Sequence, residues 1–451
     1  METIAAPVSA PGQGAVAIVR LSGKQAKKIV APFLSKGLYK PRYVYTCDFK
    51  DKEGKHLDQL CVVFFQGPAS FTGEDVVELY THGSPFIVKK ILSCLCDAGA
   101  KMARAGEFSR RAYMNGKMSL EQVQAIPDLI EADNQLAHDI AISHLQGKLS
   151  ERIGIIKKEF LTIVAQIEGS IDFPDEVPEI DRDKLKQTLK RQYHLLNKII
   201  ENQAFGRILQ QGPKILIVGP PNVGKSSLFN LLLGESRALV SNQAGTTRDF
   251  LEARLSYQGA AYIFYDCAGI HEAQEGIEKA GIEKINQLIQ QADLCLWVHD
   301  MSNPLLKKDQ QEIESMVGVK PVLHVLNKSE LQISKENGLR KSYFFNVKEA
   351  VKISCYEERG VEALFQKIDQ FFNKDKILDD LDCLCSIRQE KSLRCIAKSM
   401  KQLLKQSTEA TFDDLLVIEL KQLLMHCDDI TGETLHEAVL DDIFSRFCVG
   451  K

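Results

Sequence analysis

The sequence predicts a multidomain protein of the α/β and α classes, with one domain inserted into another. Its 451 residues are enough for two to four domains that each bury a core of their own. Short β-rich runs alternate with helical segments across residues 212–375, a pattern typical of a mainly parallel sheet with crossover helices. Helical composition dominates on both sides of this segment. We therefore expect an α/β domain inserted into a helical domain whose two halves flank it.

The first segment, residues 1–117, is expected to form a compact α+β domain, because β-rich runs punctuated by Gly and Pro share it with helical stretches. The β-rich runs lie at residues 15–21, 61–65 and 76–80. Residues 118–211 carry Leu, Ile, Gln, Lys and Glu at helical spacing and predict the first half of the helical domain, with one break at residues 172–175. Residues 376–451 predict its second half.

Composition limits the classes of protein to consider. A formal net charge of -3 gives no general attraction to nucleic acid or to anionic membranes, so any such contact needs a local patch. The N-terminus lacks the basic start and apolar core of a secretory leader, and no apolar run reaches the roughly 20 residues that span a bilayer. The 12 cysteines are scattered without zinc-type spacing. We expect a cytoplasmic protein with reduced cysteines, no structural zinc and no membrane contact.

A phosphate-binding loop is predicted at residues 219–226, Gly-Pro-Pro-Asn-Val-Gly-Lys-Ser, between a β-rich run at 214–218 and a helical segment. Its glycines let backbone N–H groups close around phosphates. The ammonium of Lys225 neutralises charge on the β- and γ-phosphates, and we therefore assign Lys225 a catalytic role. The Ser226 hydroxyl is suited to coordinate Mg²⁺. The residues of this loop expected to bind GTP are Asn222, Val223, Gly224, Lys225, Ser226 and Ser227.

Two further segments complete a site for Mg²⁺ and the γ-phosphate. Asp266 ends a β-rich run and begins the pattern Asp-x-x-Gly, in which the aspartate holds the Mg²⁺ shell and the N–H of Gly269 senses the γ-phosphate. Before this pattern, Gly-Thr-Thr-Arg-Asp at residues 245–249 offers Thr247 from a switch loop. We therefore assign Mg²⁺ coordination to Ser226 and Thr247.

A base-reading loop is predicted at residues 327–330, Asn-Lys-Ser-Glu, after the β-rich run 322–326. Its nucleotide-contacting residues are Asn327, Lys328 and Glu330. GTPases end this loop in aspartate, whereas a glutamate accepts from both guanine N–H groups with a different reach. Ser354, after the last β-rich run, would close the base pocket. Together these motifs predict a Ras-like P-loop GTPase domain, with an ATPase as the alternative.

Hydrolysis of GTP needs a polar residue that orients the attacking water. Many small GTPases place glutamine directly after Asp-x-x-Gly, whereas this chain has Ile270 there, which cannot orient water. Glu278, at the start of a predicted helix just beyond, is the candidate to position or activate the water. The alternative for Glu278 is a solvated glutamate favoured by the helix dipole.

Several motifs are absent from ordinary GTPases. They are Gly-Gln-Gly at residues 12–14, Arg-Leu-Ser-Gly at 20–23, Ser-Phe-Thr-Gly-Glu-Asp at 70–75, His-Gly at 82–83, Gly-Glu-Phe-Ser at 106–109, Ile-Asp-Phe-Pro-Asp at 171–175 and Phe-Cys-Val-Gly-Lys at 447–451. With the nucleotide motifs, they resemble the MnmE (TrmE) family of tRNA-modification GTPases over essentially the full length. The chain departs from the family's pattern at Cys267, usually Thr, at His271, usually Arg, and at Glu330.

The resemblance implies a homodimer in which residues 1–117 resemble folate-binding modules and hold 5,10-methylene- or 5-formyl-tetrahydrofolate as a one-carbon donor. The family's folate-contacting positions correspond to Arg20, Glu78, Lys117 and Lys451. Cationic side chains suit the glutamyl carboxylate of folate, and a carboxylate suits the pterin N–H edge. The family places Cys448 near the folate, where a thiol could assist one-carbon chemistry as a catalytic residue. The alternative for Cys448 is a packed spectator.

The resemblance also implies that K⁺ brings two GTPase domains together and supplies the positive charge of an arginine finger. The family's K⁺-contacting positions correspond to Asn222, Ser241, Gln243 and Thr246. Side-chain and backbone oxygen atoms suit such a hard cation. Ser241 and Thr246 would contact GTP as well, and Glu278 falls at the family's water-activating position.

A cationic helix face is the candidate surface for tRNA. Its basic residues step by three or four positions and are Arg388, Lys391, Arg394, Lys398, Lys401 and Lys405. The alternative is a solvated face without a partner. A second basic cluster consists of Lys101, Arg104, Arg110 and Arg111.

The function implied by the resemblance is GTP hydrolysis coupled to tRNA modification. With a flavin-dependent, FAD-containing partner resembling MnmG (GidA), in a heterotetramer or larger assembly, the chain would install a carboxymethylaminomethyl or aminomethyl group at C5 of the wobble uridine of certain tRNAs. GTP hydrolysis would drive domain closure and opening. Two rivals are a regulatory GTPase of ribosome assembly and an interaction scaffold with a degenerate GTPase domain.

Overall fold

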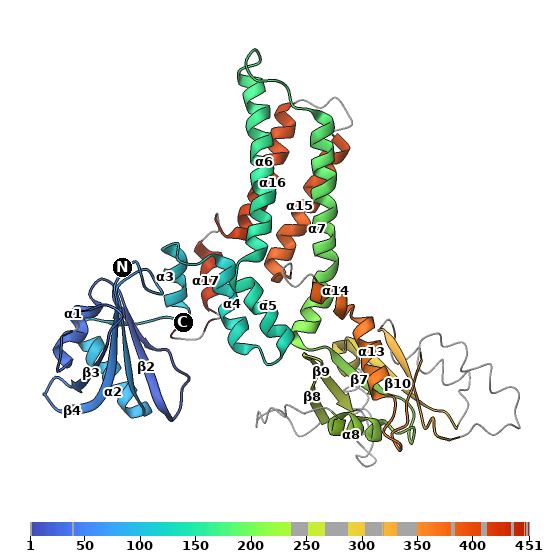
Figure 1. Cartoon of the computed structure of the whole chain (residues 1–451), viewed down its shortest axis with the longest axis horizontal. Helices are drawn as coiled ribbons and strands as arrows, with labels where there is room; N and C mark the ends of the chain where they lie inside the picture. The colour runs from blue at the N-terminus through green and yellow to red at the C-terminus, as the bar shows by residue number, and fades with distance from the viewer. Residues whose placement is uncertain are drawn as a thin grey trace, which may run out of the picture. The chain divides into compact units, whose positions relative to one another are not determined.

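The structure is a computed structural model that describes residues 2–37, 40–235, 251–266, 287–302, 318, 320–331, 350–379, 384–406, 413–433, 437–445, 447 and 450. The chain divides into two compact units. Figure 1 shows its elements coloured by residue number. The first unit comprises Met1–Pro127, His144–Gln192 and Lys391–Lys451. The second comprises Asp128–Ser143 and Tyr193–Glu390. Each unit therefore combines segments that lie far apart in the sequence.

The first unit begins with a mixed sheet whose strands run in the spatial order β3-β4-β5-β2-β1-β6. The strands are β1 (Ile4–Pro7), β2 (Gly14–Ser22), β3 (Val44–Lys50), β4 (His56–Phe65), β5 (Val76–Gly83) and β6 (Lys101–Met102). Neighbours are antiparallel except β1 and β6, which are parallel. The helical elements beside the sheet are α1 (Ala26–Val30), η1 (Ala31–Phe33) and α2 (Pro85–Asp97).

The two faces of this sheet have different characters, because side chains alternate along each strand. Val19 and Leu21 of β2, with Val77 and Leu79 of β5, are buried in a core shared with α1 and α2. The intervening residues belong to the opposite face. Arg20 pairs in register with Glu78, so these two side chains emerge beside each other on that opposite face.

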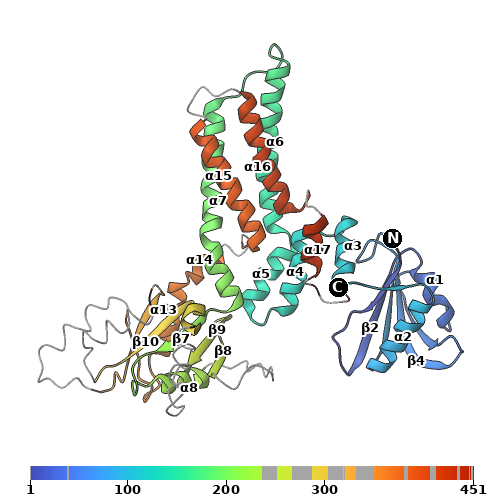
Figure 2. The ribbon, with the colours of Figure 1, turned by 180° about the vertical axis from the view of Figure 1, so that it is seen from behind.

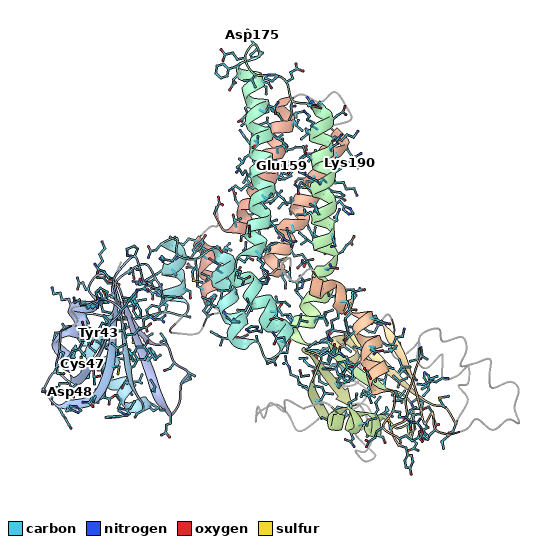
Figure 3. The ribbon with its side chains drawn as sticks, viewed as in Figure 1. Tyr43, Cys47, Asp48, Glu159, Asp175 and Lys190 are labelled. Atoms are coloured by element: carbon cyan, nitrogen blue, oxygen red, sulfur yellow. The ribbon has the colours of Figure 1, made fainter. Side chains whose placement is uncertain are left out.

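Besides α1 and α2, the described helices that belong wholly to the first unit are α3 (Glu107–Met114), α6 (Lys148–Asp172), α16 (Asp413–Thr431) and α17 (Glu437–Ser445). Helices α6 and α16 lie side by side in both views (Figures 1 and 2). Lys157 of α6 joins them through ion pairs of 2.6 Å to Asp428 and to Glu433. Glu159 of α6, labelled in Figure 3, accepts a 2.6 Å hydrogen bond from Gln192.

The prediction of a single break within residues 118–211 is wrong. The structure has α4 (Leu120–Glu131), α5 (Gln135–Leu145), α6 and α7 (Arg182–Gln211) in this segment. Asn134 caps α5 by accepting a 2.9 Å hydrogen bond from the N–H of Ala137, and Gly147 begins α6 with φ of 74°. Only the break after α6 was predicted, and Asp175 lies in that loop (Figure 3).

The second unit holds a sheet with the spatial order β12-β11-β10-β7-β9-β8. Its strands are β7 (Lys214–Val218), β8 (Leu251–Tyr257), β9 (Ala260–Asp266), β10 (Leu294–Asp300), β11 (Val322–Asn327) and β12 (Val351–Lys352). Helices α8 (Lys225–Glu235), α13 (Val361–Phe371), α14 (Lys374–Asp379) and α15 (Ile387–Gln406) follow in the chain. All pairings are parallel except that of β8 with β9. The predicted mainly parallel α/β domain, inserted into helical segments, is confirmed.

The core of this sheet includes residues from outside its own segment. Leu136 and Ile140 of α5 are buried in one cluster with strands β7 to β11 and with α13. The N–H of Leu136 donates a 3.0 Å hydrogen bond to the carbonyl of Gly259 in the turn between β8 and β9. Arg254 of β8 forms a 2.7 Å ion pair with Asp133, just before α5. Helix α5 therefore completes the nucleotide-binding domain.

Candidate functional site

The phosphate loop between β7 and α8 has a backbone that requires glycine at two positions. Gly219 has φ of 147°, and a Cβ there would lie 2.6 Å from the carbonyl oxygen of Val298. Gly224 has φ of 96°, and a Cβ there would lie 2.3 Å from the side-chain amide nitrogen of Asn327. Asn222 also adopts a left-handed conformation, with φ of 63°. The loop can therefore curl tightly and present its N–H groups to phosphate.

The phosphate loop carries one buried lysine, Lys225, and ends in two exposed serines, Ser226 and Ser227. The Lys225 ammonium crosses the loop and donates to the carbonyl oxygens of Gly219, at 3.0 Å, and Pro220, at 2.8 Å. Ser226 and Ser227 are exposed in the first turn of α8. The N-terminus of a helix carries positive potential and N–H groups that favour phosphate. Ser226 is therefore accessible to a Mg²⁺ ion held beside the phosphates.

Asp266 lies at the carboxyl end of β9 and is 2% exposed. Its register partner on the neighbouring β7 is Ile217, two residues before Gly219. Parallel pairing thus brings Asp266 to the sheet edge from which the phosphate loop emerges. This is the place from which a carboxylate can hold the water shell of Mg²⁺.

The base-reading loop is joined to the phosphate loop by direct hydrogen bonds. Asn327 is 2% exposed and donates through its side-chain amide to the carbonyl of Val223 at 2.9 Å. Its side-chain oxygen accepts a 3.2 Å hydrogen bond from the N–H of Cys355. Asn327 therefore joins the phosphate loop, at Val223, to the loop at Cys355. These two loops lie more than a hundred residues apart in the sequence.

Lys328 is the second link between these loops. Its ammonium donates to the carbonyl of Asn222 at 3.1 Å and forms a 2.5 Å ion pair with Asp300. Burial pushes the pKa of the Asp300 carboxyl up, but hydrogen bonds from Lys328 and Ser302 outweigh burial and hold that pKa below its usual value. The ionised Asp300 thus fixes the lysine across the phosphate loop.

Glu330 is the residue that departs from the usual aspartate. Its Oε2 atom is buried and has no hydrogen-bond partner among the residues that the structure describes. Burial raises the pKa of the nearby Cys355 thiol to about 11, and the charge of Glu330 adds to the rise against a hydrogen bond from Asn327. A buried carboxylate oxygen needs donors, and the two N–H groups of guanine would supply them. Glu330 therefore fits a guanine base.

Ser354, predicted to close the base pocket, lies directly before Cys355 in the sequence. It is fully buried, and its hydroxyl accepts a 3.0 Å hydrogen bond from the N–H of Glu357. Its backbone exchanges two 3.0 Å hydrogen bonds with Arg359. Ser354 thus shapes the turn that carries Cys355 to Asn327, while its own hydroxyl is already engaged in that turn.

The remaining predicted residues of the nucleotide site lie outside the described part of the chain. They are Ser241, Gln243, Thr246, Thr247, Gly269 and Glu278, together with Cys267, Ile270 and His271. Cys448 and Lys451 of the terminal motif lie outside it as well. Their roles stay predictions.

A second polar cluster lies on the sheet face of the first unit that α1 and α2 do not cover. Arg20 forms a 2.8 Å ion pair with Glu78 through its Nε atom. The Tyr80 hydroxyl donates a 2.7 Å hydrogen bond to the other carboxylate oxygen of Glu78. The Arg20 guanidinium also lies 5.1 Å from the ring centroid of Phe71 and 5.5 Å from that of Phe108. Arg20 and Glu78 are therefore fixed in one geometry.

The loop 66–75 beside this cluster is held by a buried network. Arg111 donates to Glu74 at 2.9 Å and to Glu107 at 2.8 Å. The Ser22 hydroxyl lies 2.7 Å from both the Glu74 carboxylate and the Thr72 hydroxyl. Buried charges of this kind need such complete pairing. The network explains the motif Ser-Phe-Thr-Gly-Glu-Asp as a rigid loop.

Lys117 lies beside the same loop. The Lys117 side chain is exposed, and its Cγ would lie 3.2 Å from a Cβ placed on Gly73. Gly73, with φ of 77°, therefore leaves room for the lysine stem against the loop. Lys117 can present its ammonium to an anion beside the loop, whereas no contact joins it to Arg20 in the part of the chain described.

Several residues of these sites were missed from sequence alone. Asp300 is the register partner of Asn327 at the ends of two parallel strands, and pairing adjacent strand ends would have pointed to it. Tyr80 is two residues from Glu78 on β5, so the alternation of side chains places both on one face. Phe71 and Phe108 gave no local signal, because their contacts with Arg20 depend on the tertiary fold.

The fold and the first of these sites define a P-loop GTPase, since a parallel sheet carries a phosphate loop bonded to an Asn-Lys-x-Glu loop. A sequence model of the MnmE helical domain matches residues 120–448, and one of the GTP-binding protein TrmE N-terminus matches residues 3–117. Proteins described as tRNA modification GTPase MnmE are similar over 100% of this chain. The chain belongs to the MnmE family and is a GTPase that acts in tRNA modification.

These relatives span the whole chain. The protein of Cytophaga hutchinsonii is 34% identical, with 98% of its length covered. Those of Aquifex aeolicus and Thermotoga petrophila are 34% and 35% identical, each covered over 100% of its length. Among solved structures, the G domain of the T. maritima FeoB iron transporter is 25% identical, with a TM-score of 0.27, covering 35% of this chain and 98% of that one. Within the described residues, no helix is long and apolar enough to cross a membrane.

Proposed function

We propose that this chain is a K⁺-dependent GTP hydrolase that, with an FAD-containing partner resembling MnmG (GidA), modifies C5 of the wobble uridine of certain tRNAs. The group installed is carboxymethylaminomethyl or aminomethyl, and a tetrahydrofolate bound by the N-terminal domain supplies its one-carbon unit. The reaction takes place in the cytoplasm, where tRNA is processed. The observation that supports this proposal most is the Arg20, Glu78 and Tyr80 cluster, a second ligand-like site on a chain that also carries a GTPase site.

The residues of the cluster fit a folate. Glu78 presents a carboxylate, the group that a pterin N–H edge requires, and Tyr80 and Arg20 hold it in one orientation. Phe71 is 36% exposed and offers a ring face for an aromatic ligand beside the cluster. The exposed Lys117 suits the glutamyl carboxylate. Bound folate would supply the one-carbon unit, while these side chains bind and orient it.

In the GTPase site, Lys225 and the N–H groups of the phosphate loop hold the β- and γ-phosphates. Ser226 and, by the family pattern, Thr247 hold Mg²⁺, and Asp266 orients its water shell. Glu278 positions the attacking water, and K⁺ is held by Asn222 with Ser241, Gln243 and Thr246. Asn222 is exposed on the phosphate loop, which suits an ion shared with a second GTPase domain. Binding of the base is assigned to Asn327 and Glu330.

A homodimer through the N-terminal domain is part of the proposal. Val16 and Val44 are 59% and 58% exposed on the sheet face that also carries Arg20. Exposed apolar residues on a sheet face favour burial against another surface. A second copy of the chain would cover this face and place two folate sites near the dimer axis.

The GTPase mechanism is tested by hydrolysis rates of the purified chain in KCl and NaCl at equal ionic strength. Strong activation by K⁺, abolished by Glu278→Ala, supports the assigned roles of K⁺ and Glu278. Asn222→Ala should remove the K⁺ response while leaving a slow rate in NaCl. Equal rates in both salts would overturn the K⁺ assignment.

Folate binding is tested by isothermal titration with 5-formyl-tetrahydrofolate. Arg20→Gln should weaken binding by more than tenfold, because it removes a charged hydrogen bond worth about 1.5–3 kcal/mol. Lys24→Gln, an exposed lysine in the loop after β2, serves as the matched control and should bind like the wild type. Modified nucleosides are then measured after incubation of tRNA, GTP and folate with the purified partner.

A further inference from the structure

Helix α15 presents an exposed cationic face over most of its length. Its exposed basic residues are Lys391, Arg394, Lys398, Lys401 and Lys405. The opposite side of the helix is apolar and buried through Leu393, Ile396, Met400 and Leu403. Arg388, the remaining member of the predicted stripe, is half-buried and does not belong to this face. We call the five exposed residues the α15 cationic face.

The positive charge of this face is not neutralised by its own helix. The single carboxylate of α15, Glu390, is 7% exposed and is paired with Arg207 of α7. Within the described residues, Lys391, Lys398 and Lys401 take part in no ion pair. Three ammonium groups thus stand in solvent on one side of a helix in a chain whose formal net charge is -3. The local charge is opposite to that of the whole chain.

Three of the four residues of the second basic cluster, Lys101, Arg110 and Arg111, form ion pairs within the first unit. Lys101 pairs with Glu2 at 2.6 Å. Arg110 pairs with Glu437 at 3.1 Å and with Asp441 at 2.9 Å. Arg111 forms its ion pairs within the buried network that holds loop 66–75. These ion pairs lower the charge that the cluster can offer to a polyanion, and Arg104 remains as an exposed member of it. The structure thus separates two clusters that looked alike in sequence.

The spacing of the α15 cationic face suits a polyanion that runs along the helix. From Lys391 to Lys405 the helix advances about 21 Å, given a rise of 1.5 Å per residue, so a cation occurs about every 5 Å. Four of the five are lysines, which bind phosphates as point charges without reading base edges. The face offers no exposed aromatic residue for stacking on bases. Its chemistry therefore matches a nucleic-acid backbone recognised without regard to sequence.

An anionic membrane is the other polyanion to consider, and the helix does not fit it. Helices that lie in a bilayer interface bury their apolar side among the lipids. The apolar side of α15 is already buried within the protein through Leu393, Ile396 and Met400. Only charge would remain for a membrane contact.

We propose that the α15 cationic face binds the phosphate backbone of the tRNA substrate and holds it against the helical domain. This inference rests on the proposed function, since tRNA modification supplies the polyanion. Each lysine that contacts a phosphate releases counterions on binding, so affinity falls with salt in proportion to the number of contacts. The face makes the contact independent of tRNA sequence, and recognition of the wobble position lies elsewhere.

The test measures binding of a labelled tRNA transcript to the full chain by fluorescence anisotropy. The KCl concentration is varied from about 50 to about 300 mM, a range in which affinity that depends on phosphate contacts falls steeply. The variant Lys398→Gln/Lys401→Gln should lower the slope of log affinity against log salt by about 1.5 and weaken binding roughly tenfold at the lowest salt. The matched control is Lys89→Gln/Lys90→Gln, which removes two exposed lysines from α2. The control should bind as the wild type does, and both variants should hydrolyse GTP at the wild-type rate.

An unchanged slope and affinity in the α15 variant would overturn the assignment of this face. If the α15 variant loses binding to anionic phospholipid vesicles but still binds tRNA, the face is a membrane contact and the assignment to tRNA is overturned. If the α15 variant binds tRNA normally while the wild type and its partner still modify tRNA, only this inference fails. If the wild type and its partner produce no modified uridine, the proposed function fails whatever the α15 variant does.

Discussion

Asn327 donates a 2.9 Å hydrogen bond to the carbonyl of Val223, which ties the base-reading loop to the phosphate loop through protein atoms alone. The same side chain accepts from the N–H of Cys355. The three loops of the candidate nucleotide site are thus linked by one buried amide. Preorganisation lowers the cost of ordering these loops when a ligand binds.

Replacing Asn327 by alanine should weaken binding of GDP and GTP by about 30- to 100-fold. The change leaves the Val223 carbonyl and the Cys355 N–H buried without partners, at a cost of about 2–3 kcal/mol. Titration of a fluorescent GDP analogue measures the affinity. Asn230→Ala, an exposed asparagine on α8, is the control and should leave affinity unchanged. Equal affinities for both variants would mean that the loops are held by other contacts.

Glu330→Gln should change the base preference of the site from guanine to xanthine. The substitution replaces one carboxylate acceptor by an amide donor, which meets the 2-carbonyl of xanthine but repels the 2-amino group of guanine. We expect GTP affinity to fall by about two orders of magnitude, because the variant loses charge-assisted hydrogen bonds that contribute about 1.5–3 kcal/mol. Competition by xanthosine triphosphate should improve in the same variant. A variant that loses GTP without gaining xanthosine triphosphate would place Glu330 outside the base site.

The nucleotide-binding domain should lose stability as pH falls from about 7 to 5. His299 and His324 share a 2.8 Å hydrogen bond on neighbouring strands, and burial together with the charge of His324 lowers the pKa of His299 to about 3. The unfolded histidine binds its proton near pH 6.5, so the unfolded state takes up more protons below that pH. The stabilisation from His299 is present above pH 6.5 and is lost towards pH 3, by up to about 1.4 kcal/mol per pH unit. Burial lowers the pKa of His324 as well, so His324 acts in the same direction.

The chain offers its own probe for that measurement. Its single tryptophan, Trp297, lies on β10 two residues from His299. Urea unfolding, followed by the fluorescence of this tryptophan, measures the stability of the domain. The measurements are made at about pH 7, 6 and 5, which covers the upper part of the range in which the unfolded state takes up more protons. The double variant His299→Gln/His324→Gln should flatten the pH dependence. A wild-type midpoint that stays constant across this range contradicts the prediction.

Asp369→Ala should destabilise the same domain by about 3–5 kcal/mol. Asp369 forms a 3.1 Å ion pair with Lys374, which is 4% exposed, and it also accepts from the Tyr262 hydroxyl. Removing the carboxylate leaves a buried ammonium uncompensated. Tyr262→Phe, which removes one hydroxyl from the same cluster, should cost only about 1 kcal/mol. Trp297 fluorescence again gives both unfolding midpoints, and equal shifts would show that the charge of Lys374 is solvated.

The sequence predicted those parts of the site that local chemistry determines. The phosphate loop needs glycine at Gly219 and Gly224 because of its backbone, so its motif is legible without a structure. Asp300 and Tyr80 were not predicted, because their roles arise from strand neighbours. The helix starts at Asn134 and Gly147 were also missed, although a capping asparagine and a left-handed glycine are local signals.

The two basic clusters show why composition alone could not separate function from structure. Lys101, Arg110 and Arg111 are matched by carboxylates that lie up to hundreds of residues away, as Arg110 is by Glu437. Such pairing depends on the tertiary fold and leaves no pattern in the local sequence. The α15 lysines Lys391, Lys398 and Lys401 differ in that they take part in no ion pair within the described residues.

The contribution of α5 to the sheet core bears on how the protein can be dissected. A fragment limited to residues 212–375 would lack Leu136 and Ile140, and each buried aliphatic side chain is worth about 1.5–3 kcal/mol. It would also lose the ion pair between Arg254 of β8 and Asp133. Truncated proteins made for biochemistry would therefore need residues 128–143 supplied in trans or by fusion. The inserted sheet and the segment 128–143, far from it in the sequence, thus belong to one compact unit.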